Sequence, residues 1–236
     1  MANIIITGAS SGIGFEAVLD FTANKENNVI ALARSADKLR KLHEISTSLN
    51  PEGGKLYPAQ FDIVYDNYSD SLVPFIQSKF ETVDILVNNA GILINKSFLD
   101  TSLEEFAQVL QTNLLGHINM IKHVAPLMKS GGHIVNIGSM GGFQGASKFP
   151  GLSAYSTSKG ALATLTECLA EEFKEQGIKV NCLALGSSQT EMFEEAFPGV
   201  EAGTLAFEMG RYIADFAQNG HKYYNGKILP VANTTP

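Results

Sequence analysis

Residues 3–14 read NIIITGASSGIG, and this stretch decides the fold that we expect for the chain. The run of β-branched residues from 3 to 7 predicts a strand that is buried on both faces. The glycines that follow let the backbone turn tightly and let a phosphate approach the N–H groups at the start of the next helix. We therefore predict a nucleotide-binding strand–turn–helix unit, and the alternative is a turn that only connects the two elements. The expected contacts are Gly8, Ser10, Ser11, Gly12, Ile13 and Gly14.

The rest of the chain alternates between short apolar runs and helical patterns. Further strands are predicted at 28–33, 55–61, 83–87, 133–137, 178–183 and 227–231, and helices at 35–49, 68–80, 101–128, 155–175 and 205–217. Such alternation implies right-handed crossovers and a parallel sheet. We predict an α/β Rossmann fold, a doubly wound parallel sheet of about seven strands with helices on both faces. Residues 1–236 are expected to form a single domain, with a substrate segment at about 186–204.

Composition argues against several classes of function. The chain has 236 residues, of which 44% are hydrophobic and 17% are charged, and its net charge is −7. This acidic balance, without a dense Lys/Arg run, argues against nucleic acid as the main partner. No apolar run reaches the roughly 18 residues that a membrane span needs. Residues 3–7 lead into the glycine turn without the basic start of a signal peptide, so we expect a soluble cytoplasmic protein.

Neither the cysteines nor the histidines predict a metal site. Cys168 and Cys182 lie in apolar segments without metal-ligand spacing, so buried free thiols are expected for both. His117 and His123 share a predicted helix without nearby ligand partners, which favours core packing or surface exposure over metal binding. We predict that the protein binds no metal.

Tyr155 and Lys159 are the residues that we expect to carry out proton transfer. They are four residues apart at the start of a helix, so they lie on one face of it, one turn apart. A phenol with a pKa of about 10 is a poor acid at neutral pH, and a neighbouring ammonium group lowers that pKa. The pair can therefore exchange a proton with a carbonyl or an alcohol. The alternative is a chance pair on a solvated helix face.

The glycine turn at 8–14, a motif at the end of another strand and a serine make the chance pair less plausible. Asn88-Asn89-Ala90-Gly91 ends a predicted strand, where the amides can brace the sheet and the floor of a cofactor site, and the small residues leave room for a planar group. Ser139 follows another buried strand. Asn113 lies within the long helix although Asn is a poor helix former, which indicates a buried kink, a water-binding role or an exposed neutral position.

The end of the second strand decides between cofactors. An acidic side chain there would accept hydrogen bonds from the adenosine ribose and repel a 2′-phosphate, but the sequence has Arg34. A guanidinium suits a phosphate, so NADP(H) is favoured over NAD(H), and a solvated loop arginine is the alternative. Asp62 follows the third strand, where it can accept a hydrogen bond from an adenine amino group or cap the next turn.

Together these motifs resemble the short-chain dehydrogenase/reductase family, in its small single-domain branch. The matching patterns are Thr-Gly-x-x-x-Gly-x-Gly at 7–14, Asn-Asn-Ala-Gly at 88–91, and Ser139 with Tyr-x-x-x-Lys at 155–159. They occur in the family's order, on the predicted elements, and the resemblance covers nearly the whole chain. It also implies a homodimer or homotetramer.

The resemblance implies a role for each catalytic residue. Tyr155 would donate the proton to a carbonyl oxygen as hydride arrives from the nicotinamide, while Lys159 would lower its pKa and hold the nicotinamide ribose. Ser139 would hydrogen-bond the substrate oxygen, and Asn113 would anchor a water that links Lys159 to solvent. The implied cofactor contacts are Asp62 and Ile63 at the adenine, Thr190 at the carboxamide, and Asn89, Ala90, Gly91 and Gly186 in the groove.

Four features depart from the family pattern. Leu185 stands where relatives have proline, which is expected to loosen the loop after it. Ser139 and Tyr155 are further apart than usual, so the loop between them is expected to reshape the substrate mouth. The segment 191–204 is shorter than in many relatives, which implies a more open pocket or one completed by a partner chain. Ser11 replaces a second basic residue, so 2′-phosphate recognition would rest mainly on Arg34.

We therefore predict an NADP-dependent oxidoreductase that interconverts a small carbonyl and a secondary alcohol, with Tyr155 as general acid and base. The alternative is a non-catalytic regulatory protein that binds a dinucleotide; lost catalytic residues would be its hallmark, and none is lost. Six apolar residues either line a pocket for a partly apolar substrate or pack under the loops: Phe143, Phe149, Leu152, Met192, Phe193 and Phe197.

Overall fold

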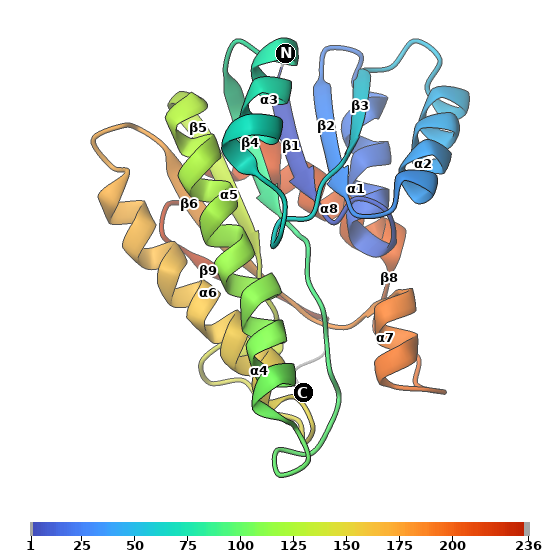
Figure 1. Ribbon diagram of the computed structural model, residues 1–236, viewed down its shortest axis with the longest axis vertical. Coiled ribbons are helices and arrows are strands. Elements are labelled where there is room, and N and C mark those ends of the chain that lie inside the picture. Colours follow the sequence, from blue (N-terminus) through green and yellow to red (C-terminus); the bar gives the residue numbers. More distant parts are fainter. Residues whose placement is uncertain (1, 234–236) are drawn as a thin grey trace.

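The computed structural model describes residues 2–233, and a seven-stranded sheet forms its centre (Figure 1). All neighbouring strands pair in parallel. The strands are β1 (Asn3–Thr7), β2 (Asn28–Ala33), β3 (Lys55–Gln60), β4 (Val83–Asn88), β5 (Met128–Ile137), β6 (Lys179–Leu185) and β9 (Ile228–Val231). The predicted α/β fold with a doubly wound parallel sheet is confirmed.

The order of the strands locates a binding crevice. Across the sheet the order is β3-β2-β1-β4-β5-β6-β9, so the chain moves outward from β1 in one direction and then returns to its other side with β4. Connections therefore leave the carboxyl ends of β1 and β4 towards opposite edges of the sheet. In doubly wound sheets, ligands bind in the crevice that opens at this point.

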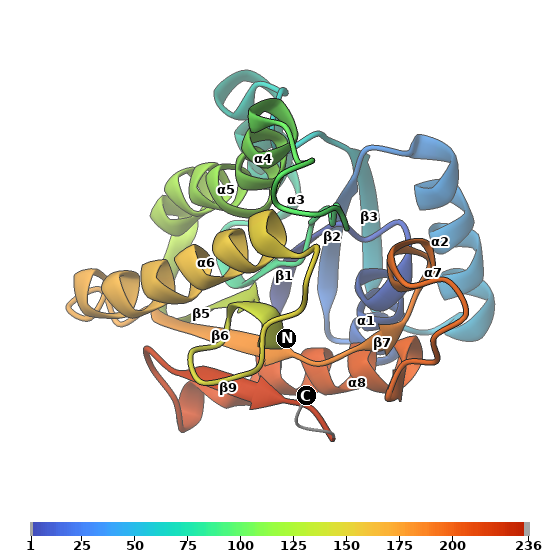
Figure 2. The same cartoon turned by 90° about the horizontal axis from the view of Figure 1, so that it is seen from below.

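Helices cover both faces of the sheet. They are α1 (Gly12–Ala23), α2 (Ala36–Leu49), α3 (Val73–Lys79), α4 (Leu103–Leu110), α5 (Gly116–Val124), α6 (Ser153–Glu172), α7 (Glu191–Ala196) and α8 (Ala206–Asn219). In Figure 2, α1 and α8 lie on one face, and α4, α5 and α6 lie on the other. A separate two-stranded sheet joins β7 (Ser188–Gln189) to β8 (Thr204–Leu205).

The centre of strand β1 is apolar because it is buried on both sides. Ile4 and Ile6 pack with Phe21 of α1 in the core on one face of the sheet. Ile5 packs with Met120 of α5 in the core on the other face. Successive side chains of a strand point to opposite faces, so a central strand of a parallel sheet needs an uninterrupted apolar run.

The long helix predicted at 101–128 is interrupted and ends earlier. It begins with a capping box between Ser102 and Glu105, and it contains a π-helical turn at Gln111–Leu115. A 3₁₀ turn then ends at Leu127. Pro126 explains this end, because proline lacks the N–H that an α-helix needs.

The strand predicted at 133–137 begins earlier and includes Gly131 and Gly132. Both glycines lie inside β5, which begins at Met128 instead of residue 133. The start of β5 is irregular, with a register shift between Val83 and Ile85 of the neighbouring strand. Irregular pairing of this kind is a tertiary feature that the local sequence does not encode.

The segment 191–204 contains regular structure. It contains α7, whose N-terminus is capped by the Thr190 hydroxyl, which accepts a hydrogen bond from the Phe193 N–H at 3.2 Å. It also reaches β8, where Thr204 pairs with Ser188. In addition, α6 ends at Glu172 and not at residue 175.

One expectation about the cysteines is wrong. Cys182 is buried in β6, as predicted, but Cys168 is exposed on α6. Within residues 2–233, no group of His, Cys, Asp or Glu side chains has the geometry to hold a metal ion. Over the same residues, every helix is too short or too polar to cross a membrane.

Candidate functional site

The glycine turn lies at the carboxyl end of β1, where it approaches the end of β4. Gly8 has a φ of +68° and Gly12 has a φ of +57°, a region that L-residues with side chains rarely adopt. A Cβ on Gly8 would lie 2.7 Å from the Cα of Ala90, and a Cβ on Gly14 would collide with the Asn89 amide. These glycines therefore let the turn and the start of α1 lie directly against the segment that follows β4.

Asn89 and Thr7 tie the two strand ends together. The Asn89 side-chain amide donates to the carbonyl oxygens of Thr7 (3.0 Å) and Gly8 (3.1 Å). In return, the Thr7 hydroxyl oxygen accepts from the N–H groups of Asn89 and Ala90, both at 3.0 Å. The predicted bracing by the amides is thus visible, while the part played by the Thr7 hydroxyl has no signal in the sequence beyond its position at the strand end.

Asn113 lies in the π-helical turn and is fully buried. Its Oδ1 accepts from the N–H of Ile92 at 2.8 Å, and its Nδ2 donates to the Ile92 carbonyl at 2.9 Å and to the Ser158 hydroxyl at 3.1 Å. The π-turn explains why a poor helix former sits there, since such turns expose a position to tertiary contacts. Of the alternatives for Asn113, the exposed position is excluded.

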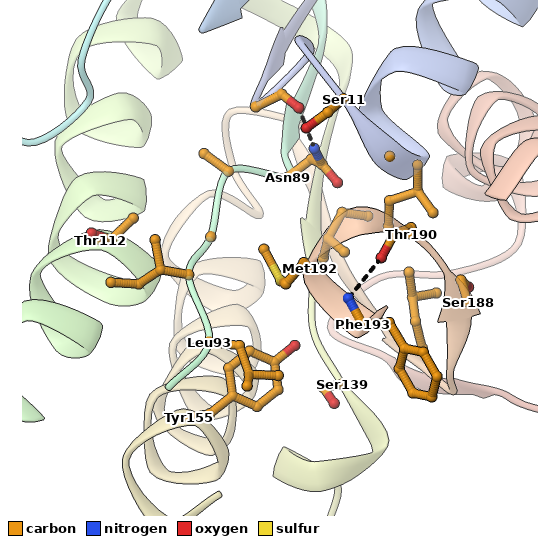
Figure 3. Close-up of a pocket in the computed structure, with 18 of the residues that line it drawn as sticks. Ser11, Asn89, Leu93, Thr112, Ser139, Tyr155, Ser188, Thr190, Met192 and Phe193 are labelled. Atoms are coloured by element: carbon orange, nitrogen blue, oxygen red, sulfur yellow. Dashed lines mark hydrogen bonds between the residues drawn. The ribbon is translucent and has the colours of Figure 1, made fainter. Parts of the chain in front are cut away.

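Tyr155, Ser139 and Lys159 converge on the other end of the crevice. Tyr155 and Lys159 lie in the first turns of α6, and Ser139 follows β5. Figure 3 shows the Tyr155 and Ser139 side chains in the same part of the pocket. Lys159 is only 4% exposed; its Nζ lies 5.8 Å from the centre of the Tyr155 ring and donates to the Ile137 carbonyl at 2.7 Å.

The electrostatics of this group differ from the sequence expectation. Burial raises the pKa of the Tyr155 phenol, and the hydrogen bond with Ser139 opposes that shift. Burial also lowers the pKa of Lys159 to about 8. Desolvation disfavours the charged form of both groups, so the lowered tyrosine pKa that the Tyr/Lys spacing predicted is not found in this arrangement.

His117 supports the floor of the site from below, which sequence reasoning missed. Its Nε2 lies 2.7 Å from the Ala90 carbonyl oxygen, and its Nδ1 is buried without a hydrogen-bond partner among the described residues. Burial, with the nearby Lys159 charge, lowers its pKa to about 3. The ring is therefore neutral at physiological pH, and its Nε2–H donates to Ala90.

A single cavity of about 790 Å³ connects the glycine turn to Tyr155. Nearly all of the predicted site residues line it: Gly8, Ser10, Ser11, Gly12, Ile13, Arg34, Asp62, Ile63, Asn89, Ala90, Gly91, Ser139, Tyr155, Lys159, Gly186 and Thr190. Two predicted residues stand behind the wall. Gly14 packs against Asn89, and Asn113 lies next to Gly91, where an added Cβ would be 3.3 Å from the Asn113 Oδ1.

The end of the cavity near Tyr155 is mostly apolar. Five of the six apolar residues that the sequence offered for a pocket line it, namely Phe149, Leu152, Met192, Phe193 and Phe197, whereas Phe143 does not. Leu93, Met140 and Val200 add to this wall, and Gln108, Gln111 and Thr112 supply polar groups. These additional residues come from loops and helix faces whose spacing carries no signal in the sequence.

The opposite end of the cavity carries Arg34 and Asp62. Gln60 donates to the Arg34 carbonyl at 2.9 Å, which fixes the backbone there, and within residues 2–233 the Arg34 guanidinium forms no ion pair. Asp62 Oδ1 accepts from the Val64 N–H at 2.8 Å. Asp62 thus caps the next turn, which is one of its two expected roles. It also lines the cavity.

Leu185 does not loosen the chain where relatives have proline. It continues β6 and pairs with Val231 of β9, and the next N–H, of Gly186, donates to the Val231 carbonyl at 2.9 Å. The strand consequently delivers Gly186 and Thr190 to the cavity from a regular element.

Comparisons with known proteins agree with this geometry. A family model described as short chain dehydrogenase matches residues 2–201. An oxidoreductase of Botryotinia fuckeliana is 33% identical over 190 residues, which cover 79% of this chain and 65% of that protein's length. A 3-oxoacyl-acyl-carrier-protein reductase of Synechocystis is 32% identical over 192 residues, which cover 80% of this chain and 75% of that protein.

Solved structures give the same result over more of the chain. A short-chain dehydrogenase/reductase from Serratia marcescens superposes with a TM-score of 0.86 at 26% identity, covering 98% of this chain and 96% of that one. A short chain dehydrogenase from Burkholderia cenocepacia, solved in complex with NADP, superposes with a TM-score of 0.84 at 25% identity and the same coverage.

Proposed function

Because the chain belongs to the short-chain dehydrogenase/reductase family, we propose that it is an NADP-dependent oxidoreductase that interconverts a small carbonyl and a secondary alcohol. One observation carries the proposal. The same cavity has Arg34 at one end and Tyr155 with Ser139 at the other, so one extended ligand can reach both. The proposal includes Tyr155 as the general acid and base.

The residues that line the cavity fit a dinucleotide. Its volume lies within the range of about 300–1,000 Å³ that is usual for ligand sites. Gly8 and Gly12 leave backbone N–H groups at the start of α1 open to a pyrophosphate. Ala90 and Gly91 form a flat wall, and Arg34 offers a guanidinium for the 2′-phosphate. A bound nicotinamide supplies hydride for reduction of the carbonyl or accepts it in the reverse direction.

The side chains near Tyr155 are suited to handle the proton. The Ser139 oxygen accepts from the Gly141 N–H at 3.1 Å, and in the proposal its own hydrogen turns from Tyr155 to the substrate oxygen. In reduction, Ser139 stabilises the negative charge that develops on that oxygen, and Tyr155 donates its proton to it. Lys159 stays mostly protonated at neutral pH with a pKa of about 8, and its charge favours the phenolate that Tyr155 becomes.

Asn113 lies behind Ser139, Tyr155 and Lys159, outside the cavity wall. Its amide holds Ile92 and Ser158 in place, next to the Lys159 side chain that Gly91 also approaches. We assign it the water that links Lys159 to solvent and returns the proton to Tyr155. It is a positioning residue in this scheme, because it does not line the cavity.

The substrate in this proposal is partly apolar. Leu152, Met192 and Phe193 border the space in front of Tyr155, and burial of apolar substrate surface against them would contribute about 25 cal/mol per Å². The segment 186–204 provides this wall through α7. A screen of aliphatic and aromatic ketones and aldehydes with NADPH tests the substrate class.

The choice of cofactor is tested by binding. We expect NADPH to bind more tightly than NADH in a fluorescence titration, and Arg34→Asp to reverse that order, because a carboxylate repels the 2′-phosphate. Arg40→Asp is the matched control, since Arg40 lies on α2 with an ion pair to Asp37 outside the cavity. Equal affinity of the unaltered protein for the two cofactors would remove NADP from the proposal.

Catalysis is tested at the phenol. Tyr155→Phe is expected to abolish turnover and keep NADPH binding, while Tyr223→Phe, at a tyrosine that is 79% exposed, leaves both unchanged. Turnover that survives Tyr155→Phe would refute the assignment of the acid. Retained binding with no turnover by the unaltered protein on any carbonyl or alcohol would favour the non-catalytic alternative.

A homodimer or homotetramer and a cytoplasmic location remain predictions. Leu103 and Leu115 are exposed on α4 and the π-turn beside it, so they provide apolar surface for a second chain on that side. Light scattering coupled to size-exclusion chromatography measures the assembly directly.

A further inference from the structure

One ion pair joins α2 to α7 at the wall of the cavity. Lys38 in α2 and Glu191 in α7 approach with Nζ and Oε2 2.9 Å apart, and both residues line the cavity. They are 153 positions apart in the sequence. In Figure 2, α7 lies on the same side of the molecule as α2.

Lys38 is placed close to the proposed 2′-phosphate site by the start of α2. Ser35, which follows Arg34, caps this helix, and its hydroxyl oxygen accepts from the Lys38 N–H at 3.3 Å. Arg34, Ser35 and Lys38 therefore form one corner of the cavity wall. A helix N-terminus with two neighbouring cations is favourable for a phosphate group.

Glu191 is fixed at the first position of α7. Thr190 caps that helix, as the hydrogen bond from Phe193 in Figure 3 shows, and a Cβ on Gly12 would lie 3.2 Å from the Thr190 Cγ2. The start of α7 thus lies across the groove from the glycine turn. The next two residues, Met192 and Phe193, line the substrate end.

From these positions we infer that Lys38 is a second determinant of cofactor choice, and that Glu191 competes with the 2′-phosphate for it. The inference rests on the proposed NADP dependence. The side chains of Lys38 and Glu191 are 50% and 67% exposed, and ion pairs with such exposure contribute little to stability. A phosphate monoester carries about −1.5 to −2 charges at neutral pH, so it outcompetes a single carboxylate for the ammonium group.

The sequence expectation that recognition of the 2′-phosphate rests mainly on Arg34 changes accordingly. When Lys38 turns to the phosphate, α7 loses its tie to α2, so the helix that carries Met192 and Phe193 responds to which cofactor is bound. NADH lacks the phosphate and leaves the Lys38–Glu191 pair intact. Cofactor choice and the substrate wall are thereby coupled through one charged pair.

Titrations of purified variants with NADPH and NADH test the inference. We expect Lys38→Met to weaken NADPH binding about fivefold to tenfold and NADH binding less than twofold, since one charge-assisted contact is lost only with the phosphate. We expect Glu191→Gln to strengthen NADPH binding about twofold to threefold. In the double variant the Glu191→Gln gain disappears, because there is no ammonium left to release. Arg40→Met, which breaks the Arg40–Asp37 pair on the same helix, leaves both affinities unchanged.

The possible failures can be told apart. If the unaltered protein prefers NADPH and Arg34→Asp abolishes this preference, but Lys38→Met lowers both affinities equally or neither, the inference is wrong and the proposed function stands. Another possible result is that Glu191→Gln strengthens NADPH binding equally with and without Lys38→Met. Glu191 would then repel the phosphate directly and would not compete with it for Lys38, so the inference would also fail. If the unaltered protein does not discriminate between the cofactors, the inference and the NADP proposal fall together.

Discussion

The Nζ of Lys159 donates a hydrogen bond to the Ile137 carbonyl oxygen across 2.7 Å, from a position that is only 4% exposed. This single acceptor does not replace the hydration that the ammonium group has in water, and burial lowers the pKa of Lys159 from 10.5 to about 8. The charge beside Tyr155 is therefore kept at a cost to the stability of the folded protein.

That cost predicts how stability changes with pH. Below pH 8 the folded and unfolded states both hold the Lys159 proton, so the cost is present in full. Between pH 8 and 10.5 the unfolded state binds this proton and the folded state has released it, so the free energy of unfolding rises with pH. The lowered pKa corresponds to about 3 kcal/mol over this interval, at 1.36 kcal/mol for each pKa unit.

Denaturant unfolding of the unaltered protein and Lys159→Met checks this prediction. Lys159→Met has no proton to release, so we expect the unaltered protein to gain stability relative to this variant as the pH rises from 8 to 10.5. The other titrating groups are shared and largely cancel in the difference. A constant difference over this range would show that the Lys159 pKa is not lowered.

Gly8 is predicted to tolerate a side chain poorly. In Gly8→Ala the methyl group meets the Ala90 backbone at 2.7–2.9 Å in addition to the strain of a φ of +68°. Gly145→Ala is a matched control, because Gly145 has a φ of +88° but no atom within 4 Å of the added carbon.

The control is expected to lose about 1–2 kcal/mol from the left-handed backbone conformation alone. Gly8→Ala should lose more and should also bind NADPH at least tenfold more weakly, because the end of β4 must move away from the turn. Melting curves and the same fluorescence titration measure the two effects. Equal losses in the two variants would mean that the contact with Ala90 is easily relieved.

Sequence reasoning located the fold because its evidence is local. The buried strand at residues 3–7 and the strand at 28–33 match the structure in both bounds, since continuous apolar runs ending in glycine or polar residues are visible without tertiary information. The helix predicted at 35–49 likewise matches α2 to within one residue, with Ser35 as its cap. By contrast, the start of β5 depends on pairing with Val83, which no local pattern reveals.

The candidate site likewise has features that the sequence predicts and features that only the folded chain reveals. Residue type and spacing alone identify the glycine turn, Ser139, Tyr155 and Lys159 as parts of one site. Their electrostatics depend on burial, and for this reason the expected direction of the Tyr155 pKa shift was wrong. Contacts between distant positions, such as His117 with Ala90 or Lys38 with Glu191, involve common residue types and have no signal before the chain is folded.

Asn113 is predicted to be required for the shape of the site as well as for its chemistry. Asn113→Ala removes its hydrogen bonds to Ile92 and Ser158 and leaves partly buried backbone groups of Ile92 without partners. Because these groups are only partly buried, we expect a loss of about 1–3 kcal/mol in the free energy of unfolding, the cost of one buried group left unsatisfied, and a loss of turnover.

Asn119→Ala on the following turns of the helix is the control, since Asn119 is half-buried and, among the described residues, its side chain makes no hydrogen bond. The change should cost less than 1 kcal/mol. Urea unfolding and turnover with NADPH provide the two measurements. An Asn113→Ala protein of unaltered stability would separate the proposed water-binding role from the structural one.

The two cysteines are predicted to differ sharply in reactivity. Cys182 is buried in β6, and burial raises the pKa of its thiol to about 11, whereas Cys168 is exposed on α6. Because the thiolate is the reactive form, a disulfide reagent at pH 8 should modify Cys168 rapidly and Cys182 only as the protein unfolds. Cys168→Ser should abolish the rapid phase and leave the melting temperature unchanged. Rapid reaction of both thiols would show that β6 opens readily beside Lys159. Protection of both would mean that another chain covers this face of α6, and the exposure of Cys168 would then not hold in the assembled protein.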